Sequence, residues 1–308
     1  MALAAAAFLF LVHGVGVTMT RAQDGVSGVG IGLRMGNSEA LLAALPREVR
    51  WVEVHPENYI ERGGRFARIL ERAREAWPVV THGLTMCFGA LEPCDPRYQR
   101  ELRSFLRDLE VSWHSDHACF GSVDGVFAHD LLPLPFTDEA VAVVSQRISE
   151  AQDALGLPVA LENVSYYAPM GADPLAEVDF LNEILSRTGA KLLLDVNNVY
   201  VNSQNFGFDA RAWIDRVPAD RVVQMHVAGH LVREDGLRID THGEPVPEGV
   251  YSLLEHTLRR TGDKPILLER DNNIPPLEEQ LDELRRLAAI VERVRASALV
   301  GTSAGVTP

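Results

Sequence analysis

The stretch Leu192-Leu193-Leu194-Asp195-Val196-Asn197-Asn198 decides the fold of this chain. It begins as a continuous apolar run, which is typical of a strand covered by helices on both faces of a parallel sheet. It ends in residue types that bind metal ions. When a parallel sheet closes into a barrel, the carboxyl ends of all its strands meet around one mouth. The stretch therefore predicts a buried parallel strand with a functional residue at its end.

Apolar runs of this kind occur at eight places along the chain. In order, they are Val29–Leu33, Trp51–Val54, Val79–Val80, Val111–Trp113, Val159–Leu161, Leu192–Leu194, Val222–Met225 and Ile266–Leu268. Eight parallel strands are the number found in a TIM (β/α)8 barrel, so we predict an α/β fold of that class.

Most segments between the runs have apolar residues at spacings of three and four, which predicts helices. These segments are Arg65–Ala76, Arg97–Leu109, Asp138–Ala154, Pro174–Arg187, Pro247–Arg260 and Pro276–Val294. Pro174 follows Asp173 and fits the first position of a helix. The segments after the first and sixth runs, Asn37–Leu45 and Asp209–Val217, are short for crossover helices.

The length of the chain predicts one domain. It has 308 residues, 46% of them hydrophobic, and a single barrel commonly takes about 250 residues. Residues 29–297 contain no linker or internal repeat, so we expect them to form the barrel. Residues 298–308 are mostly small and follow no pattern, which predicts a disordered tail.

Residues 1–28 are an N-terminal extension or a misassigned start. Ala2–Val12 is as long as the apolar core of a signal peptide and too short to span a bilayer, which takes about 20 residues. No Lys or Arg precedes it, which favours Met19 as the true start over a cleaved secretory signal. We therefore expect a cytoplasmic protein that has no membrane partner.

The net charge and the cysteines argue against several classes of function. A formal net charge of −14 argues against binding to nucleic acid, which normally requires clustered Lys and Arg. Cys87, Cys94 and Cys119 are odd in number and lack CxxC spacing, so they predict neither a disulfide framework nor a thiolate zinc site. They fit a reducing compartment as buried, inert thiols.

Four runs lead directly into Glu162, Asp195, His226 and Glu269. A single carboxylate at such a place is commonly an ion pair or a helix cap. Three acids and an imidazole around one mouth are different, because the like charges repel unless cations lie between them. The four residues together predict a metal site with several ligands.

Further imidazoles and a carboxylate belong to the same mouth. His82 and His117 follow the third and fourth runs, and Asp240-Thr241-His242 can direct a carboxylate and an imidazole toward one ion. Mixed ligation of this kind suits iron, zinc or manganese better than calcium or magnesium. His55 follows the second run and is a candidate ligand, acid–base group or substrate contact. His13, His114, His129 and His256 carry no comparable signal.

The motifs at these run ends resemble those of the multinuclear non-heme iron-dependent oxidases, the family of the methanobactin-biosynthesis iron enzyme. The matching stretches cover nearly the whole predicted barrel and are Val54-His55-Pro56-Glu57-Asn58-Tyr59, Thr81-His82-Gly83, Ser115-Asp116-His117, Leu161-Glu162-Asn163, Leu194-Asp195-Val196-Asn197-Asn198, His226-Val227-Ala228-Gly229-His230, Asp240-Thr241-His242-Gly243 and Leu268-Glu269-Arg270.

This resemblance implies a barrel with two or three iron ions that uses dioxygen to modify cysteines of a ribosomally made precursor peptide. It also implies a small partner protein that presents the leader of the peptide. Carried over by motif, the ligands are His82, His117, Glu162, Asp195, His226, Asp240, His242 and Glu269. We predict catalytic roles for His55 and Asp116. Residues predicted to bind substrate or to orient ligands are Asn58, Asn163, Asn198 and His230.

Two other classes of function share the same ligand types. A metal-dependent isomerase of the xylose isomerase type, or a hydrolase of the apurinic endonuclease type, also gathers His, Asp and Glu around clustered metals in this barrel. The acidic balance of the chain disfavours DNA as a substrate. A noncatalytic metal-binding protein is the third reading, because ligands alone do not prove turnover.

Overall fold

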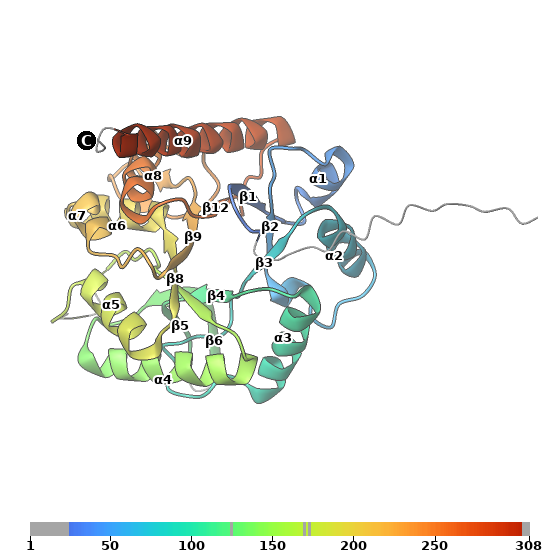
Figure 1. Cartoon of the computed structure of the whole chain (residues 1–308). Coiled ribbons are helices and arrows are strands. Elements are labelled where there is room, and N and C mark those ends of the chain that lie inside the picture. The colour runs from blue at the N-terminus through green and yellow to red at the C-terminus, as the bar shows by residue number, and fades with distance from the viewer. Residues whose placement is uncertain (1–24, 124–125, 169–170, 172–173, 304–308) are drawn as a thin grey trace, which may run out of the picture.

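The computed structural model describes residues 25–123, 126–168, 171 and 174–303, and shows a closed barrel of eight parallel strands surrounded by helices (Figure 1). The strand order around the barrel is β1-β12-β9-β8-β7-β4-β3-β2. The barrel strands are β1 (Val29–Gly32), β2 (Val52–Val54), β3 (Val79–His82), β4 (His114–His117), β7 (Val159–Glu162), β8 (Lys191–Asp195), β9 (Val222–Val227) and β12 (Ile266–Leu268). The predicted TIM barrel is confirmed.

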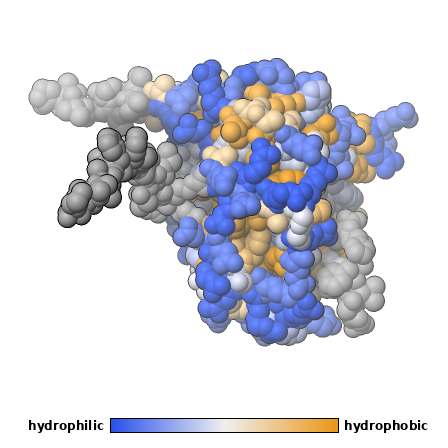
Figure 2. Space-filling view, turned by 90° about the vertical axis from the view of Figure 1, so that its right-hand side faces the viewer, coloured by the Kyte–Doolittle hydropathy of each residue, from blue (hydrophilic) through white to orange (hydrophobic). Residues whose placement is uncertain are grey.

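The helices follow the strands along the chain. They are α1 (Ser38–Ala44), α2 (Arg65–Ala76), α3 (Pro96–Leu109), α4 (Asp138–Leu155), α5 (Glu177–Thr188), α6 (Val196–Phe206), α7 (Ala210–Asp215), α8 (Glu248–Thr261) and α9 (Leu277–Ser303), with a short 3-10 turn, η1 (Pro56–Asn58), after β2. The face shown in Figure 2, which is the right-hand side of Figure 1, is largely hydrophilic with scattered apolar residues, as expected of the outer faces of such helices.

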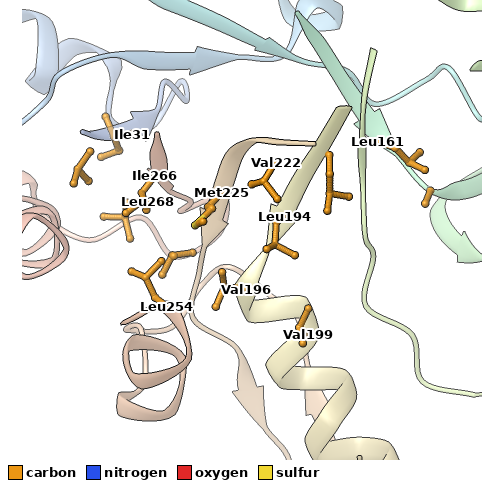
Figure 3. Close-up of a cluster of buried hydrophobic side chains, with 14 of the residues drawn as sticks. Ile31, Leu161, Leu194, Val196, Val199, Val222, Met225, Leu254, Ile266 and Leu268 are labelled. Atoms are coloured by element: carbon orange, nitrogen blue, oxygen red, sulfur yellow. The ribbon is translucent and has the colours of Figure 1, made fainter. Parts of the chain in front are cut away.

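The apolar side chains of the barrel strands lie in two layers, one outside and one inside the barrel. Leu194 of β8 and Leu268 of β12 point outward and pack with α6 and α8 residues such as Val199 and Leu254 (Figure 3). The neighbour Leu267 points inward and packs with Trp51 and Val80 in a small cluster within the barrel. Because the side chains of a strand alternate, the next inward positions toward the mouth belong to the polar residues that end the strands.

The inner cluster requires a glycine in β1. A Cβ atom on Gly30 would lie 2.4 Å from the indole ring of Trp51. The absence of a side chain at Gly30 therefore makes room for the largest residue of the inner layer, which fills the barrel below the site.

The fourth strand and the helix predicted from Pro174 have different bounds. The fourth strand is His114–His117 rather than Val111–Trp113, because α3 ends with Glu110 in the left-handed region and the N–H of Val111 still donates to the carbonyl of Leu106. The helix predicted from Pro174 starts at Glu177. The N-cap residue of this helix, Ala176, has an extended backbone conformation. Pro174 therefore lies before the helix and not at its first position.

The sixth connection and the tail also differ from the prediction. Helix α6 begins directly after β8, with the Asp195 side chain accepting from the N–H of Asn198 as its N-cap; the short segment near Asp209 is a second helix, α7. Helix α9 continues to Ser303, so residues 298–303 are helical where disorder was predicted. Ala298 and Leu299 are good helix formers, and a helix that is already formed can propagate through Gly301 at a modest cost. Residues 1–24 and 304–308 lie outside the described part of the chain.

Two hairpins were not predicted. One joins β5 (Cys119–Val123) to β6 (Val126–Pro133), directly after β4, and the other joins β10 (Leu231–Val232) to β11 (Arg238–Ile239), after β9. Both lie in loops that follow the carboxyl ends of barrel strands. They enlarge the end of the barrel at which the predicted ligands gather.

Candidate metal centre

Six of the eight predicted ligands converge inside the mouth of the barrel. They form two groups of buried side chains, in each of which one ligand atom per residue lies within 4.8 Å of the others. The first group is His82, His117 and Glu162, and the second is Glu162, Asp195, His226 and Glu269.

The first group has the dimensions of a ligand shell. His82 Nε2 and His117 Nε2 lie 3.1 Å apart, and they lie 3.1 and 3.2 Å from Glu162 Oε2. Ligand atoms that each lie about 2.1 Å from one ion are separated by about 3.0–3.4 Å at octahedral or tetrahedral angles. The triangle of two nitrogens and one oxygen therefore fits a transition-metal ion.

The second group is richer in carboxylates. His226 Nδ1 lies 3.1 Å from Glu162 Oε1 and 3.0 Å from Glu269 Oε2. Asp195 completes the group with a fully buried side chain. Glu162 takes part in both groups through different oxygens, so its carboxylate is placed to bridge two cations.

Several buried atoms of the centre lack a hydrogen bond of acceptable geometry. They include Glu162 Oε2, Asp195 Oδ2 and His226 Nδ1. A buried polar atom without a partner is costly. These three atoms point toward neighbouring ligand atoms, which is the arrangement that bound cations would satisfy. The residues of the centre therefore fit metal ions.

The electrostatics of the centre lead to the same conclusion. Burial opposes the charge on His226, but Glu53, Glu269 and Glu162 outweigh burial and hold its pKa well above the usual value. Burial likewise opposes charge on His117, and Glu162 and Asp116 raise its pKa to about 9. Without metal, protons on the imidazoles must balance the carboxylates. Metal binding would replace these protons.

The pKa of Asp195 shows that the imidazoles do not compensate all the carboxylate charge of the centre. Burial, followed by the charges of Glu162 and Asp240, raises its pKa well above the usual value. By contrast, Glu162 keeps a lowered pKa because His82 and His117 outweigh its burial. An additional cation beside Asp195 would remove the repulsion that keeps it protonated.

Outer partners orient the imidazole ligands. His226 Nε2 lies 3.0 Å from Glu53 Oε2, His82 Nδ1 lies 2.9 Å from Ser115 Oγ, and His117 Nδ1 lies 3.3 Å from Asp116 Oδ1. Such partners fix the ring and its tautomer around a metal. Asp116, predicted to be catalytic, thus lies behind His117.

Glu53 was not among the predicted site residues. It is fully buried, and its Oε2 also accepts a 2.6 Å hydrogen bond from Gln224. A carboxylate in the middle of an apolar run, two positions after the inward Trp51, was the signal that could have found it.

A third group of possible ligands consists of His55, Glu269 and Asp271. The guanidinium of Arg34 lies in it, with Nη2 3.1 Å from Glu269 Oε1 and Nε 2.5 Å from Asp271 Oδ1. His55 Nδ1 donates to the carbonyl oxygen of His82 at 2.9 Å, and burial, followed by Arg34, lowers the pKa of His55 to about 4. Neither Arg34 nor Asp271 was among the predicted site residues.

The other two predicted ligands, Asp240 and His242, pair beside the second group. His242 Nε2 lies 2.8 Å from Asp240 Oδ1, and His242 Nδ1 lies 3.6 Å from Glu269 Oε2. Asn197 donates to Asp240 and contacts His230 Nδ1 at 2.8 Å. His230 is therefore connected to the centre through Asn197 and Asp240.

The predicted asparagines lie in different places. Asn163 and Asp195 exchange hydrogen bonds through the Asn163 side chain, and Asn198 Nδ2 donates to the carbonyl of Asn163. Asn58 lies in the half-exposed turn η1, where its N–H donates to the carbonyl of His55. His114, which carried no sequence signal, is fully buried with Nδ1 3.0 Å from Thr81 Oγ1.

A TIM barrel with clustered metal-ligand side chains at the carboxyl ends of its strands is the class that this fold and site define. Residues 28–292 match the family described as RiPP precursor modification enzyme MbnB/TglH/ChrH, where RiPP denotes a ribosomally synthesised and post-translationally modified peptide. The chain belongs to this family, which confirms the resemblance to the multinuclear iron oxidases.

Relatives and solved structures agree with that placement. A UPF0276 protein of Caulobacter vibrioides is 43% identical over 83% of this chain and 91% of its own length. A UPF0276 protein of Pseudomonas aeruginosa is 42% identical over 88% of this chain and 95% of its own length. A xylose isomerase domain protein of Planctomyces limnophilus superposes with a TM-score of 0.56 at 16% identity, over 88% of this chain and 99% of that one. The last likeness shows the fold alone. None of the described helices is long and apolar enough to cross a membrane.

Proposed function

We propose that this protein is a multinuclear iron-dependent oxidase that uses dioxygen to modify cysteine residues of a ribosomally synthesised peptide. The observation that carries the proposal is the position of Glu162, whose two carboxylate oxygens contact imidazoles of different groups. A carboxylate shared in this way suits two metal ions held side by side. Membership in a peptide-modifying family supplies the substrate class.

The ligand types are compatible with iron, and the geometry favours two ions. Imidazole and carboxylate ligands together suit iron, zinc and manganese, and the groups contain no thiolate. The third group already contains the cation of Arg34 between Glu269 and Asp271. When bound, iron would supply thiolate binding and dioxygen activation.

The residues of the chain would hold the ions, keep the site dry and control protons. Glu53 and Asp116 orient the ligand imidazoles, and the inner layer around Trp51 closes the barrel below the site. The buried, neutral His55 beside the centre is placed to accept a proton from a substrate thiol or amide. We further propose a cytoplasmic location and a small partner protein that presents the leader peptide.

Metal analysis with Mössbauer spectroscopy, on protein purified anaerobically from iron-supplemented cells, tests the proposal. We expect two coupled irons per chain, and oxygen consumption that accompanies a mass change in a cysteine-containing precursor peptide. Stoichiometric zinc or manganese without iron would favour an isomerase or a hydrolase. Iron that neither consumes oxygen nor alters a peptide would favour a metal-binding protein without turnover.

A further inference from the structure

A cavity of about 570 Å³ lies beside the metal centre, in the loops that follow β2 and β3. Its volume is within the range of ligand pockets, roughly 300–1,000 Å³. The apolar part of its lining includes Ile60, Met86 and Pro93, and the charged part is Glu57, Glu92 and Asp95. Its lining residues include carboxylates and no Lys or Arg.

Hydrogen bonds hold the Glu57 side chain in one orientation. Its Oε1 accepts from the N–H of Leu84 at 2.8 Å, from the hydroxyl of Thr85 at 3.0 Å and from the hydroxyl of Tyr98 at 2.7 Å. Three donors on one oxygen fix the position of the carboxylate. Glu57 therefore presents an oriented carboxyl group at the wall of the cavity.

No Lys or Arg of the lining balances these carboxylates. The nearby Arg97 is committed to Glu101 and Glu61, with contacts of 2.7 and 2.9 Å. The thiol of Cys94, which also lines the cavity, has its pKa raised to about 12 by burial, so it remains neutral. The charge of the cavity is therefore negative, and its apolar walls suit an aliphatic stem.

The cavity is connected to the metal centre by two hydrogen bonds. The N–H of Met86 donates to Asp116 Oδ2 at 3.1 Å, and Asp116 Oδ1 accepts from the N–H of His117 at 2.7 Å. The loop that contains Met86 starts directly after the ligand His82. A group bound in this cavity therefore lies next to the first metal group. Loops at this end of a TIM barrel set substrate specificity.

We propose that this cavity binds a basic side chain, Arg or Lys, of the peptide substrate, with Glu57 as the anion that recognises it. The inference rests on the proposed peptide-modifying function and adds a rule of specificity: a basic residue lies close to the cysteine that is modified. A guanidinium supplies a planar set of donors for the Glu57 carboxylate and the positive charge that the carboxylates of the lining lack.

Binding of two isosteric probes tests the proposal. N-acetyl-arginine amide and N-acetyl-citrulline amide differ in charge and little in shape, and their binding to the metal-loaded full chain can be measured by titration calorimetry or ligand-observed NMR. We expect the arginine probe to bind about tenfold more tightly, which corresponds to about 1.4 kcal/mol. Glu57→Gln should abolish this preference, whereas Glu71→Gln, an exposed carboxylate on α2, should preserve it.

Equal binding of the two probes by the unaltered protein would overturn the proposal, and so would a Glu57→Gln variant that keeps the preference. If that variant does not fold, Glu92→Gln, which changes an exposed residue of the lining, should reduce the preference about threefold. An arginine preference in a protein that contains zinc would support the binding of a basic side chain in the cavity and contradict the oxidase function. Iron and oxygen consumption together with equal probe binding would support the oxidase function and contradict the role of the cavity.

Discussion

Carboxylates are buried both in the metal centre and at the cavity around Glu177, but their pKa values shift in opposite directions. Glu162 is 3% exposed and Glu177 is 8% exposed. Burial opposes the charge on both, but imidazoles outweigh it at Glu162 and lower the pKa of that residue, whereas burial dominates at Glu177 and raises its pKa to about 8. A buried acid alone therefore does not indicate a metal site. Convergence with other ligand types does.

The surroundings of Glu177 explain the difference. It lines a cavity of about 430 Å³ together with aromatic side chains that include Phe136, Phe206 and Trp213. The hydroxyl of Tyr166 donates to its Oε2 at 3.4 Å. Neutral donors such as Tyr166 offset the burial of Glu177 only in part, so burial still favours the protonated form. We expect Glu177 to be a neutral acid at pH 7.

Removal of the bridging carboxylate should have the largest effect in either region. Glu162→Ala takes a ligand from both groups, so we expect metal affinity to fall by more than about 100-fold at both positions. Asp195→Ala should affect the second group alone. Metal content per chain, measured after dialysis against a chelator, distinguishes the two variants. Circular dichroism provides the control for folding, because the apolar core lies elsewhere.

If Glu162→Ala retained one metal per chain, the shared carboxylate would not be a bridge. If Glu177→Gln lost metal as readily as Glu162→Ala, the contrast between the two regions would have no physical basis.

The second prediction concerns stability at the Glu177 cavity. The pKa of Glu177 is about 8 in the folded protein, against 4.5 for an ordinary Glu, so the folded state keeps a proton that the unfolded state has released between these values. The contribution of Glu177 is therefore present in full below about pH 4.5 and lost as pH rises toward 8, by about 1.4 kcal/mol per pH unit.

Glu177→Gln should remove that slope and make the protein more stable than the unaltered chain at pH 8. Urea unfolding of the metal-loaded protein at pH 5, 6.5 and 8 measures the free energy of unfolding. Glu183→Gln, an exposed carboxylate on the same helix, is the matched control. Parallel pH profiles for Glu177→Gln and the unaltered protein would show that Glu177 is charged in the folded state.

Most of the barrel and of the centre could be predicted because one pattern specifies both. A continuous apolar run predicts a buried parallel strand, and the residue that ends it lies at the mouth, as for Glu162 and His226. The fourth strand was displaced because its sequence, His114-Ser115-Asp116-His117, is polar. Tertiary packing, which buries all four residues, overrides the weak local preference of such a sequence.

Residues that act from the strand interior were harder to find. Glu53 stands inside a run instead of after it, and Arg34 lies beyond the first run as a cation among expected ligands. Only the alternation of inward positions, which starts from Gly30 in β1 and Trp51 in β2, would have placed both side chains inside the barrel. The register of neighbouring strands, Ile31 with Val52 and Gly32 with Glu53, then brings them together.

The third prediction tests Glu53 as an orienting residue. Glu53→Gln keeps the size of the side chain but removes the charge that faces His226 Nε2. We expect metal affinity at the second group to fall about 10- to 100-fold while the first group is unchanged. Competition with a chromogenic chelator measures the two affinities. Equal losses at both groups would identify Glu53 as a residue that supports the whole barrel.

The smallest expected effect is that of Asp116→Asn, and it separates two roles. Asn keeps one oxygen, which can still accept the backbone N–H of His117, but its amide nitrogen cannot accept from the N–H of Met86, and the 3.3 Å contact with the imidazole loses its charge. If Asp116 orients His117, affinity at the first group should fall about tenfold, in keeping with an outer partner, and turnover should recover when metal is added in excess. If Asp116 is the catalytic residue predicted from the sequence, affinity should be unchanged and excess metal should not restore oxygen consumption. Because its other oxygen accepts from Met86 at the wall of the acidic cavity, we expect the first outcome.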